Sequence, residues 1–361
     1  MQKIKHDAAY TNLHPLMDDL EFLYADISER EKKKLSRQQG LLNLPYDDSF
    51  STLLELLKEQ DGFDDSEIAL EHKEIKPLKL QKYDTKNIIV CYSGGKDSFS
   101  VVRHYQRMGY NVFAYHIKGL NRTYHDEWKV AEQAAQELGF TLIMDTVAYS
   151  GNHTWIEHPL KNMIMLNMAL TYGVRNGIGT KIATGNFQTS FIKDVAFEVC
   201  GGDCIEMWKA YEKIIQRIIP KFTLHIPNRN FQTAYNALLK EPEYLKYTIS
   251  CLTPNRFRNL FRERTMRNYK VDLLPNRCGC CWKCAAEYIW FCDHNVLPYD
   301  KDYYIHCMEV LLNTVEQETG YLMHNIEYVW SLYLFYPMKK SKAYKELKNA
   351  FVRSRKIKIA Y

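Results

Sequence analysis

Short apolar runs alternate with single amphipathic segments between residues 87 and 184, and this alternation constrains the fold more than any other feature. The runs are 87–92 (NIIVCY), 111–117 (NVFAYHI), 140–145 (FTLIMD) and 180–184 (TKIAT), and the helical segments between them are 93–109, 126–139 and 158–177. Single helices between strands predict a doubly wound, mostly parallel α/β sheet with right-handed crossovers. The ligand of such a sheet is expected at the carboxyl ends of its strands.

A polar loop with two glycines stands directly between the first apolar run and the first helical segment. Its residues are Ser93, Gly94, Gly95, Lys96, Asp97 and Ser98. The glycines let the backbone turn sharply near a ligand, and the helix that follows offers unpaired N–H groups to phosphate. Ser93 and Ser98 add hydroxyl donors and Lys96 adds charge. The carboxylate of Asp97 suits a bridging Mg²⁺ ion. The alternative is a plain turn in which Asp97 and Ser98 cap the helix.

The loop differs from a Walker loop, which has four residues between its first glycine and Gly-Lys-Ser/Thr. It resembles the loop of the PP-loop N-type ATP pyrophosphatases, a family with an adenine nucleotide alpha hydrolase-like, Rossmann-like fold. The resemblance implies that the loop holds the β and γ phosphates of ATP while the α phosphorus is attacked. The family's second nucleotide element is a glycine after the fourth strand, and Gly185 occupies that place. Gly-Asn after a strand is otherwise an ordinary turn.

Four of the ten cysteines lie within seven residues, which indicates a metal site. Cys278, Cys281 and Cys284 form a Cys-x2-Cys-x2-Cys pattern, and Cys251 is the candidate for the fourth ligand of a tetrahedral zinc ion. Whether Cys278 or Cys280 is the ligand stays open. An iron–sulfur cluster is the main chemical alternative, and buried free thiols are the other.

A PP-loop followed by Ser-Cys and then by Cys-Gly-x-Cys-x-x-Cys is similar to the arrangement in the 7-cyano-7-deazaguanine synthases. The similarity covers residues 86–295 and implies a structural zinc on the four cysteines. It also implies substrate contacts by Lys161, Asn162 and Asp203, which stand near the places of the family's Pro-Gly-Arg-Asn and Tyr-Pro-Asp-Cys elements. The family's Tyr-Gly-Gln element is absent from residues 116–127, and the Tyr-Pro before Asp203 is missing. Both departures fall on the substrate side.

The resemblance implies an ATP-dependent ligase of queuosine biosynthesis that forms C–N bonds. A substrate carboxylate attacks the α phosphorus of ATP, pyrophosphate leaves, and ammonia displaces AMP to give an amide. A second round gives the nitrile of a 7-deazaguanine. The expected catalytic residues are Ser93, Lys96, Asp97 and Ser98, and the expected ligands are ATP, Mg²⁺ and Zn²⁺. The alternatives are a PP-loop tRNA sulfurtransferase, a synthase-like enzyme of a phage or defence system that attaches a deazapurine to a macromolecule, and a nucleotide-binding scaffold without catalysis.

The chain divides into four predicted regions. They are a helical extension at 1–85, the ATP pyrophosphatase domain at 86–240, the zinc segment at 241–295 and a helical, basic region at 296–361. Residues 339–361 carry nine Lys/Arg and one Glu, which is typical of a solvated helix or of a docking surface for a nucleic-acid or protein acceptor. The net charge of +5 permits an anionic substrate. Because there is no secretory signal and no run of about 18 apolar residues, we expect a cytoplasmic protein without a membrane partner. Whether the chain forms a homodimer stays open.

Overall fold

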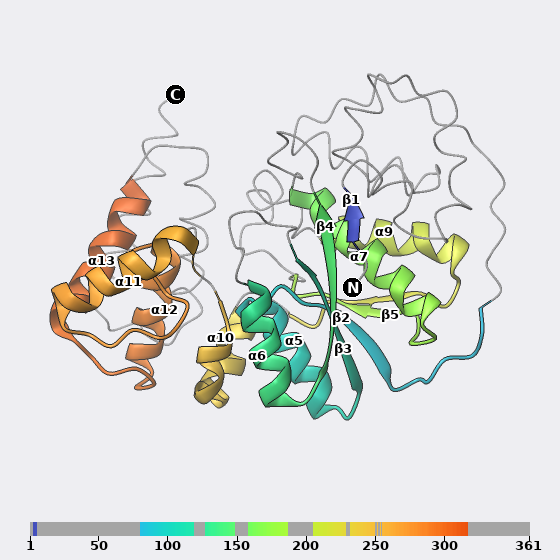
Figure 1. Ribbon diagram of the computed structural model, residues 1–361, viewed down its shortest axis with the longest axis horizontal. Coiled ribbons are helices and arrows are strands. Elements are labelled where there is room, and N and C mark those ends of the chain that lie inside the picture. The colour runs from blue at the N-terminus through green and yellow to red at the C-terminus, as the bar shows by residue number, and fades with distance from the viewer. Residues whose placement is uncertain are drawn as a thin grey trace, which may run out of the picture.

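A six-stranded parallel sheet forms the centre of the chain (Figure 1). The computed structural model describes residues 3–5, 80–118, 127–148, 158–186, 205–228, 232–249, 251, 253 and 255–316. The strands are β1 (Lys3–Lys5), β2 (Asn87–Cys91), β3 (Asn111–Lys118), β4 (Thr141–Ala148), β5 (Lys181–Ala183) and β6 (Thr223–His225). They lie in the order β1-β4-β3-β2-β5-β6, and every neighbouring pair is parallel. The predicted parallel α/β sheet is therefore confirmed.

Helices cover both faces of this sheet (Figure 1). On one face, α5 (Lys96–Arg107) packs on β2 and β3, and α6 (Glu127–Leu138) packs on β3 and β4. On the other face, α7 (His158–Arg175) contacts β2 and β5, and α9 (Ile205–Ile218) contacts β6. Because both faces are covered, the central strand β2 is an uninterrupted apolar run rather than an alternating one.

The side chains of β2 show how close this packing is. Ile88 and Val90 belong to the apolar cluster that contains Phe99 of α5. Successive side chains of a strand point to opposite faces, so Ile89 faces α7. There, a Cβ atom on Gly173 would lie only 2.2 Å from Ile89 Cδ1. A glycine in α7 therefore permits the close approach of this helix to the sheet.

The chain beyond the sheet folds into a helical unit, whose last three helices are seen at the left of Figure 1. Its elements are α10 (Gln232–Lys240), the 3-10 helix η4 (Pro242–Tyr247), α11 (Asn255–Tyr269), α12 (Trp282–Asp293) and α13 (Lys301–Glu316). α10 packs on α5, and its Tyr235 ring lies 5.4 Å from Trp290 and 5.7 Å from Phe291, measured between ring centroids. One apolar cluster thus joins the helical unit to the sheet.

A buried ion pair holds the segment before α12. Arg277 Nη2 lies 2.6 Å from Glu287 Oε1, and Arg277 Nε donates to Glu287 Oε2 at 2.7 Å. The same guanidinium donates to the carbonyl and the hydroxyl of Thr248. Hydrogen bonds on both carboxylate oxygens keep this charge pair satisfied in the protein interior.

Two short strands go beyond the sequence predictions. β6 lies in the predicted ATP pyrophosphatase domain at 86–240 but was not among the predicted strands, and β1 lies within the predicted helical extension 1–85. Each has three residues, which are too few to show the alternating pattern of a strand. The rest of residues 1–79 and residues 317–361 lie outside the described residues, so the helical extension and the basic tail stay predictions. None of the described helices combines the length and the apolarity needed to cross a bilayer.

Candidate functional site

The glycine loop lies where the strand order of the sheet reverses. From β2 the chain passes through α5 to β3 on one side, whereas β5 pairs with β2 on the other side. The loops after β2 and β5 therefore diverge at the carboxyl edge, which is where open parallel sheets bind their ligands. Residues 93–95 follow β2 and residues 184–186 follow β5. Both predicted nucleotide elements thus lie at this switch point.

Hydrogen bonds of its own two serines stabilise the glycine loop. Ser93 Oγ and Ser98 Oγ are 3.2 Å apart, and Ser98 Oγ donates to Gly95 O at 3.1 Å. Gly94 has a φ of 81°, in the left-handed region that glycine enters without steric cost. Gly95 is the N-cap of α5, and no side chain caps this helix end. The helix N-terminus is therefore not closed by Asp97 or Ser98, and its first N–H groups suit an anion.

Gly185 packs directly on the backbone of that loop. A Cβ atom at this position would lie 2.8 Å from Ser98 N and 3.1 Å from Asp97 C and Ser98 Cα. Because these are backbone atoms, a larger residue would displace the first turn of α5. The two nucleotide elements named from the sequence are thus in contact, and the contact requires a glycine.

A buried asparagine that the sequence analysis missed joins the two elements. Asn228 is 2% exposed, and its Nδ2 donates to Gly185 O at 3.1 Å and to Asp97 O at 3.3 Å. Ser100 Oγ donates to Asn228 Oδ1 at 3.1 Å. A single asparagine after a three-residue strand has no distinguishing local pattern, so only its place in the fold reveals it.

Lys96 and Asp97 form an ion pair at the start of α5. Lys96 is 3% exposed, and its Nζ lies 3.1 Å from Asp97 Oδ2 and 5.1 Å from the centre of the Tyr235 ring. Asp97 Oδ1 is buried and has no hydrogen-bond partner within the described part of the chain. A buried, unpaired carboxylate oxygen is costly unless a cation or a donor satisfies it. This oxygen could therefore bind a hard, oxygen-preferring cation such as Mg²⁺.

Four cysteine side chains meet in the helical unit. The Sγ atoms of Cys251, Cys278, Cys281 and Cys284 all lie within 4.8 Å of one another. The Sγ atoms of Cys278 and Cys284 are 3.8 Å apart. A tetrahedral ion with Zn–S bonds of about 2.3 Å has sulfur–sulfur edges of about 3.8 Å, so this set could hold one metal ion such as zinc. The geometry selects Cys278 for the set. Cys280 Sγ lies beside it, 3.6 Å from Cys278 Sγ.

Backbone N–H groups also point at this cysteine cluster. Cys280 N and Cys281 N donate to Cys278 Sγ at 3.4 and 3.3 Å. Hydrogen bonds with the neighbouring thiols lower the pKa of the Cys278 thiol, and the bond with Cys251 has the largest effect. Burial acts in the opposite direction. Hydrogen bonds with Cys251 and then Cys278 raise the pKa values of Cys281 and Cys284. The thiols therefore cannot all ionise by themselves, and a bound cation would favour all four thiolates.

One backbone stretch connects the cysteine cluster to the glycine loop. Ile249 N donates to Gly94 O at 3.0 Å, and the ligand Cys251 follows two residues later. Thr248, just before Ile249, accepts the hydrogen bonds of Arg277, which is next to Cys278 in the chain. A metal ion on the cysteines would thus help to hold the segment that lies against the glycine loop.

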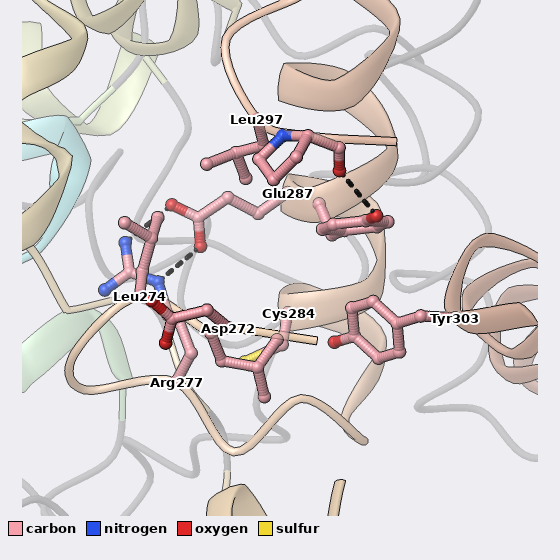
Figure 2. A pocket seen from close by; sticks show the side chains of 10 residues that line it. Asp272, Leu274, Arg277, Cys284, Glu287, Leu297 and Tyr303 are labelled. Atoms are coloured by element: carbon pink, nitrogen blue, oxygen red, sulfur yellow. Dashed lines mark hydrogen bonds and ion pairs between the residues drawn. The ribbon is translucent and has the colours of Figure 1, made fainter. Parts of the chain in front are cut away.

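A pocket opens beside the cysteine cluster (Figure 2). Arg277 and Glu287 lie on one side of it and Tyr303 on the other. The two charged groups are paired with each other, and Tyr303 Oη donates to Gly279 O at 2.9 Å. Because these polar groups have protein partners, we assign the pocket no ligand.

The predicted substrate residues lack described side chains. Lys161 and Asn162 belong to α7, but nothing beyond their backbone is described, and Asp203 lies outside the described residues. Their contact with a substrate stays a prediction.

Comparison with protein-family models gives no match, and comparison with curated proteins gives no significant match. The class of the protein is therefore defined by its own geometry. It is a parallel α/β protein with helices on both faces of the sheet, compatible with a Rossmann-like nucleotide-binding fold. It also carries a four-cysteine cluster that could hold a metal ion.

Proposed function

We propose that the protein is an ATP pyrophosphatase, which transfers AMP to a substrate and releases pyrophosphate. The observation that carries the proposal is the contact of Gly185 with the first turn of α5, at the point where the strand order reverses. This contact brings together the two elements by which the chain resembles PP-loop enzymes. The uncapped N-terminus of α5 and the buried Asp97 Oδ1 add support, because one suits phosphate and the other suits Mg²⁺.

The chain's own groups would act mainly by positioning and by charge. The N–H groups at the N-terminus of α5 would bind the β and γ phosphates, and the Ser93–Ser98 contact keeps the loop in shape. Lys96 would neutralise charge, and Asp97 Oδ1 would hold Mg²⁺. When bound, Mg²⁺ supplies further neutralisation of the phosphate oxygens. A substrate oxygen then attacks the α phosphorus in line with the leaving pyrophosphate, so aligned binding accounts for most of the rate.

For the substrate we propose a small 7-deazaguanine carboxylate, with ammonia as the nitrogen donor. The proposal rests on the resemblance to 7-cyano-7-deazaguanine synthases, with Lys161, Asn162 and Asp203 on the substrate side. The cysteine geometry supports it, because four convergent thiolates form a closed structural zinc site. An iron–sulfur cluster would place several iron and sulfide atoms between the cysteines and hold them farther apart. Zinc therefore fits better than the cluster of a sulfurtransferase.

The test is incubation of the protein with ATP, Mg²⁺, ammonia and 7-carboxy-7-deazaguanine, followed by mass spectrometry. We expect AMP, pyrophosphate and an amide or nitrile product. Asp97→Ala and Ser93→Ala should abolish turnover, whereas the control Asp272→Ala, whose side chain is 91% exposed, should retain it. Release of ADP and orthophosphate would reject AMP transfer. AMP release that depends on tRNA or on a protein acceptor instead would reject the small substrate.

A further inference from the structure

One face of α11 carries apolar and cationic side chains in a single stripe. Phe257, Leu260, Arg264 and Arg267 follow one another at intervals of three, four and three residues, which places them on the same side of a helix. All four are exposed. The opposite side of α11 faces the protein, where Arg258 and Thr265 are buried. We call these four residues the α11 stripe.

The apolar part of the stripe is exposed but firmly supported. Leu260 is 60% exposed and Phe257 is 39% exposed, so both belong to the few large apolar side chains that are exposed in the described residues. The ring of Phe257 stacks on Phe261, with 6.1 Å between centroids and 26° between planes. Phe261 in turn packs against the cysteine cluster. The stacked pair therefore forms an aromatic platform at the surface that rests on the cysteine cluster.

Within the described residues, the cationic part of the stripe has no neutralising partner. Residues 255–270 contain six Arg/Lys and one Glu. Arg258 is buried and Arg262 is half-buried, and the two donate to the carbonyls of Thr253 and Leu273. Arg264 and Arg267 form no ion pair with any residue in the described part of the chain. The stripe thus offers two uncompensated guanidinium groups next to an aromatic pair.

We propose that the α11 stripe binds single-stranded nucleic acid. Aromatic platforms on which bases stack, next to cations that follow the backbone, are the combination by which proteins bind single strands. From Phe257 to Arg267 the helix rises about 15 Å, which is room for a few nucleotides. A small substrate would need a concave site, and the stripe is a helix surface. This inference does not depend on the proposed ATP chemistry.

The test measures binding of a fluorescent 12-nucleotide poly-U strand to the full chain between 50 and 200 mM salt. Replacing two phosphate contacts with Arg264→Ala/Arg267→Ala should make the slope of log K against log salt shallower by about 1.4. Arg264→Lys/Arg267→Lys should keep the slope. The control Arg175→Ala/Lys209→Ala removes two exposed cations from the other face of the sheet and should leave the slope unchanged.

A second arm separates base stacking from charge. Phe257→Ala should weaken binding by about 10-fold at every salt concentration without changing the slope, because stacking is not ionic. The control Tyr299→Ala removes another exposed ring and should bind as the wild type does. Because every variant is the full chain, the contribution of other basic segments to binding is the same in each and cancels when variants are compared. Three results would overturn the proposal: no binding by the wild type, equal effects of the controls, or equally good displacement by poly-glutamate, which would indicate an acidic protein partner.

Discussion

The contact between Gly185 and α5 leads to a sharp prediction for Gly185→Ala. The new Cβ atom would lie 2.8 Å from Ser98 N, whereas ordinary contact begins at 3.4 Å. The first turn of α5 must therefore move away by about 0.6 Å, and overpacking of this kind costs about 1–3 kcal/mol. If the loop binds the phosphates of ATP in its present shape, that cost appears as ATP affinity lowered about 5- to 150-fold.

The assay is calorimetric titration with ATP and Mg²⁺, together with a thermal melt. Gly139→Ala is the matched control, because its φ of 67° strains any side chain but its Cβ would meet nothing within 4 Å. It should lower the melting temperature and leave ATP affinity unchanged. A Gly185→Ala protein that binds ATP as tightly as the wild type would refute the assignment of Gly185 to the nucleotide site.

Three further predictions concern the helical unit. Elemental analysis should find about one zinc per chain in the wild type and in Cys280→Ser, but not in Cys281→Ser. Cys281→Ser should also unfold more easily, because structural zinc contributes folding free energy. Equal zinc in both variants would contradict the ligand set. Glu287→Gln should destabilise the fold by about 3–5 kcal/mol in denaturant titration, because Arg277 would keep a buried, unpaired charge; a loss below about 1 kcal/mol would contradict this. Burial raises the pKa of Asp293 to about 6, so its ionisation opposes folding and stability falls as pH rises from about 4 to 6. Asp293→Asn should therefore melt at a higher temperature than the wild type at pH 7.5 and lose this advantage near pH 4; an advantage that grows at low pH would reverse the assigned sign.

Much of the α/β layer could be predicted from the sequence, because its signals are local. The apolar runs at 87–92, 111–117 and 140–145 have the length and composition of buried strands, and each corresponds to a strand of the sheet. The glycine loop at 93–98 carries its chemistry within six residues. Strands β1 and β6 escaped prediction because three residues show no periodicity and, unlike the equally short β5, neither follows one of the predicted helical segments.

Tertiary structure alone decided how these pieces meet. Asn228 joins Asp97 across 131 positions in the sequence and Gly185 across 43, and no local pattern specifies such contacts. Spacing favoured Cys278 but left a swap with Cys280 open, whereas the fold brings Cys278 together with the other three thiols. The same holds for α11, whose composition shows an excess of arginine but not which arginines face inward. Periodicity and composition report the chemistry that a segment carries. The side chains that it contacts depend on the path of the whole chain, because residues distant in sequence meet only after the sheet and the helical unit have packed together.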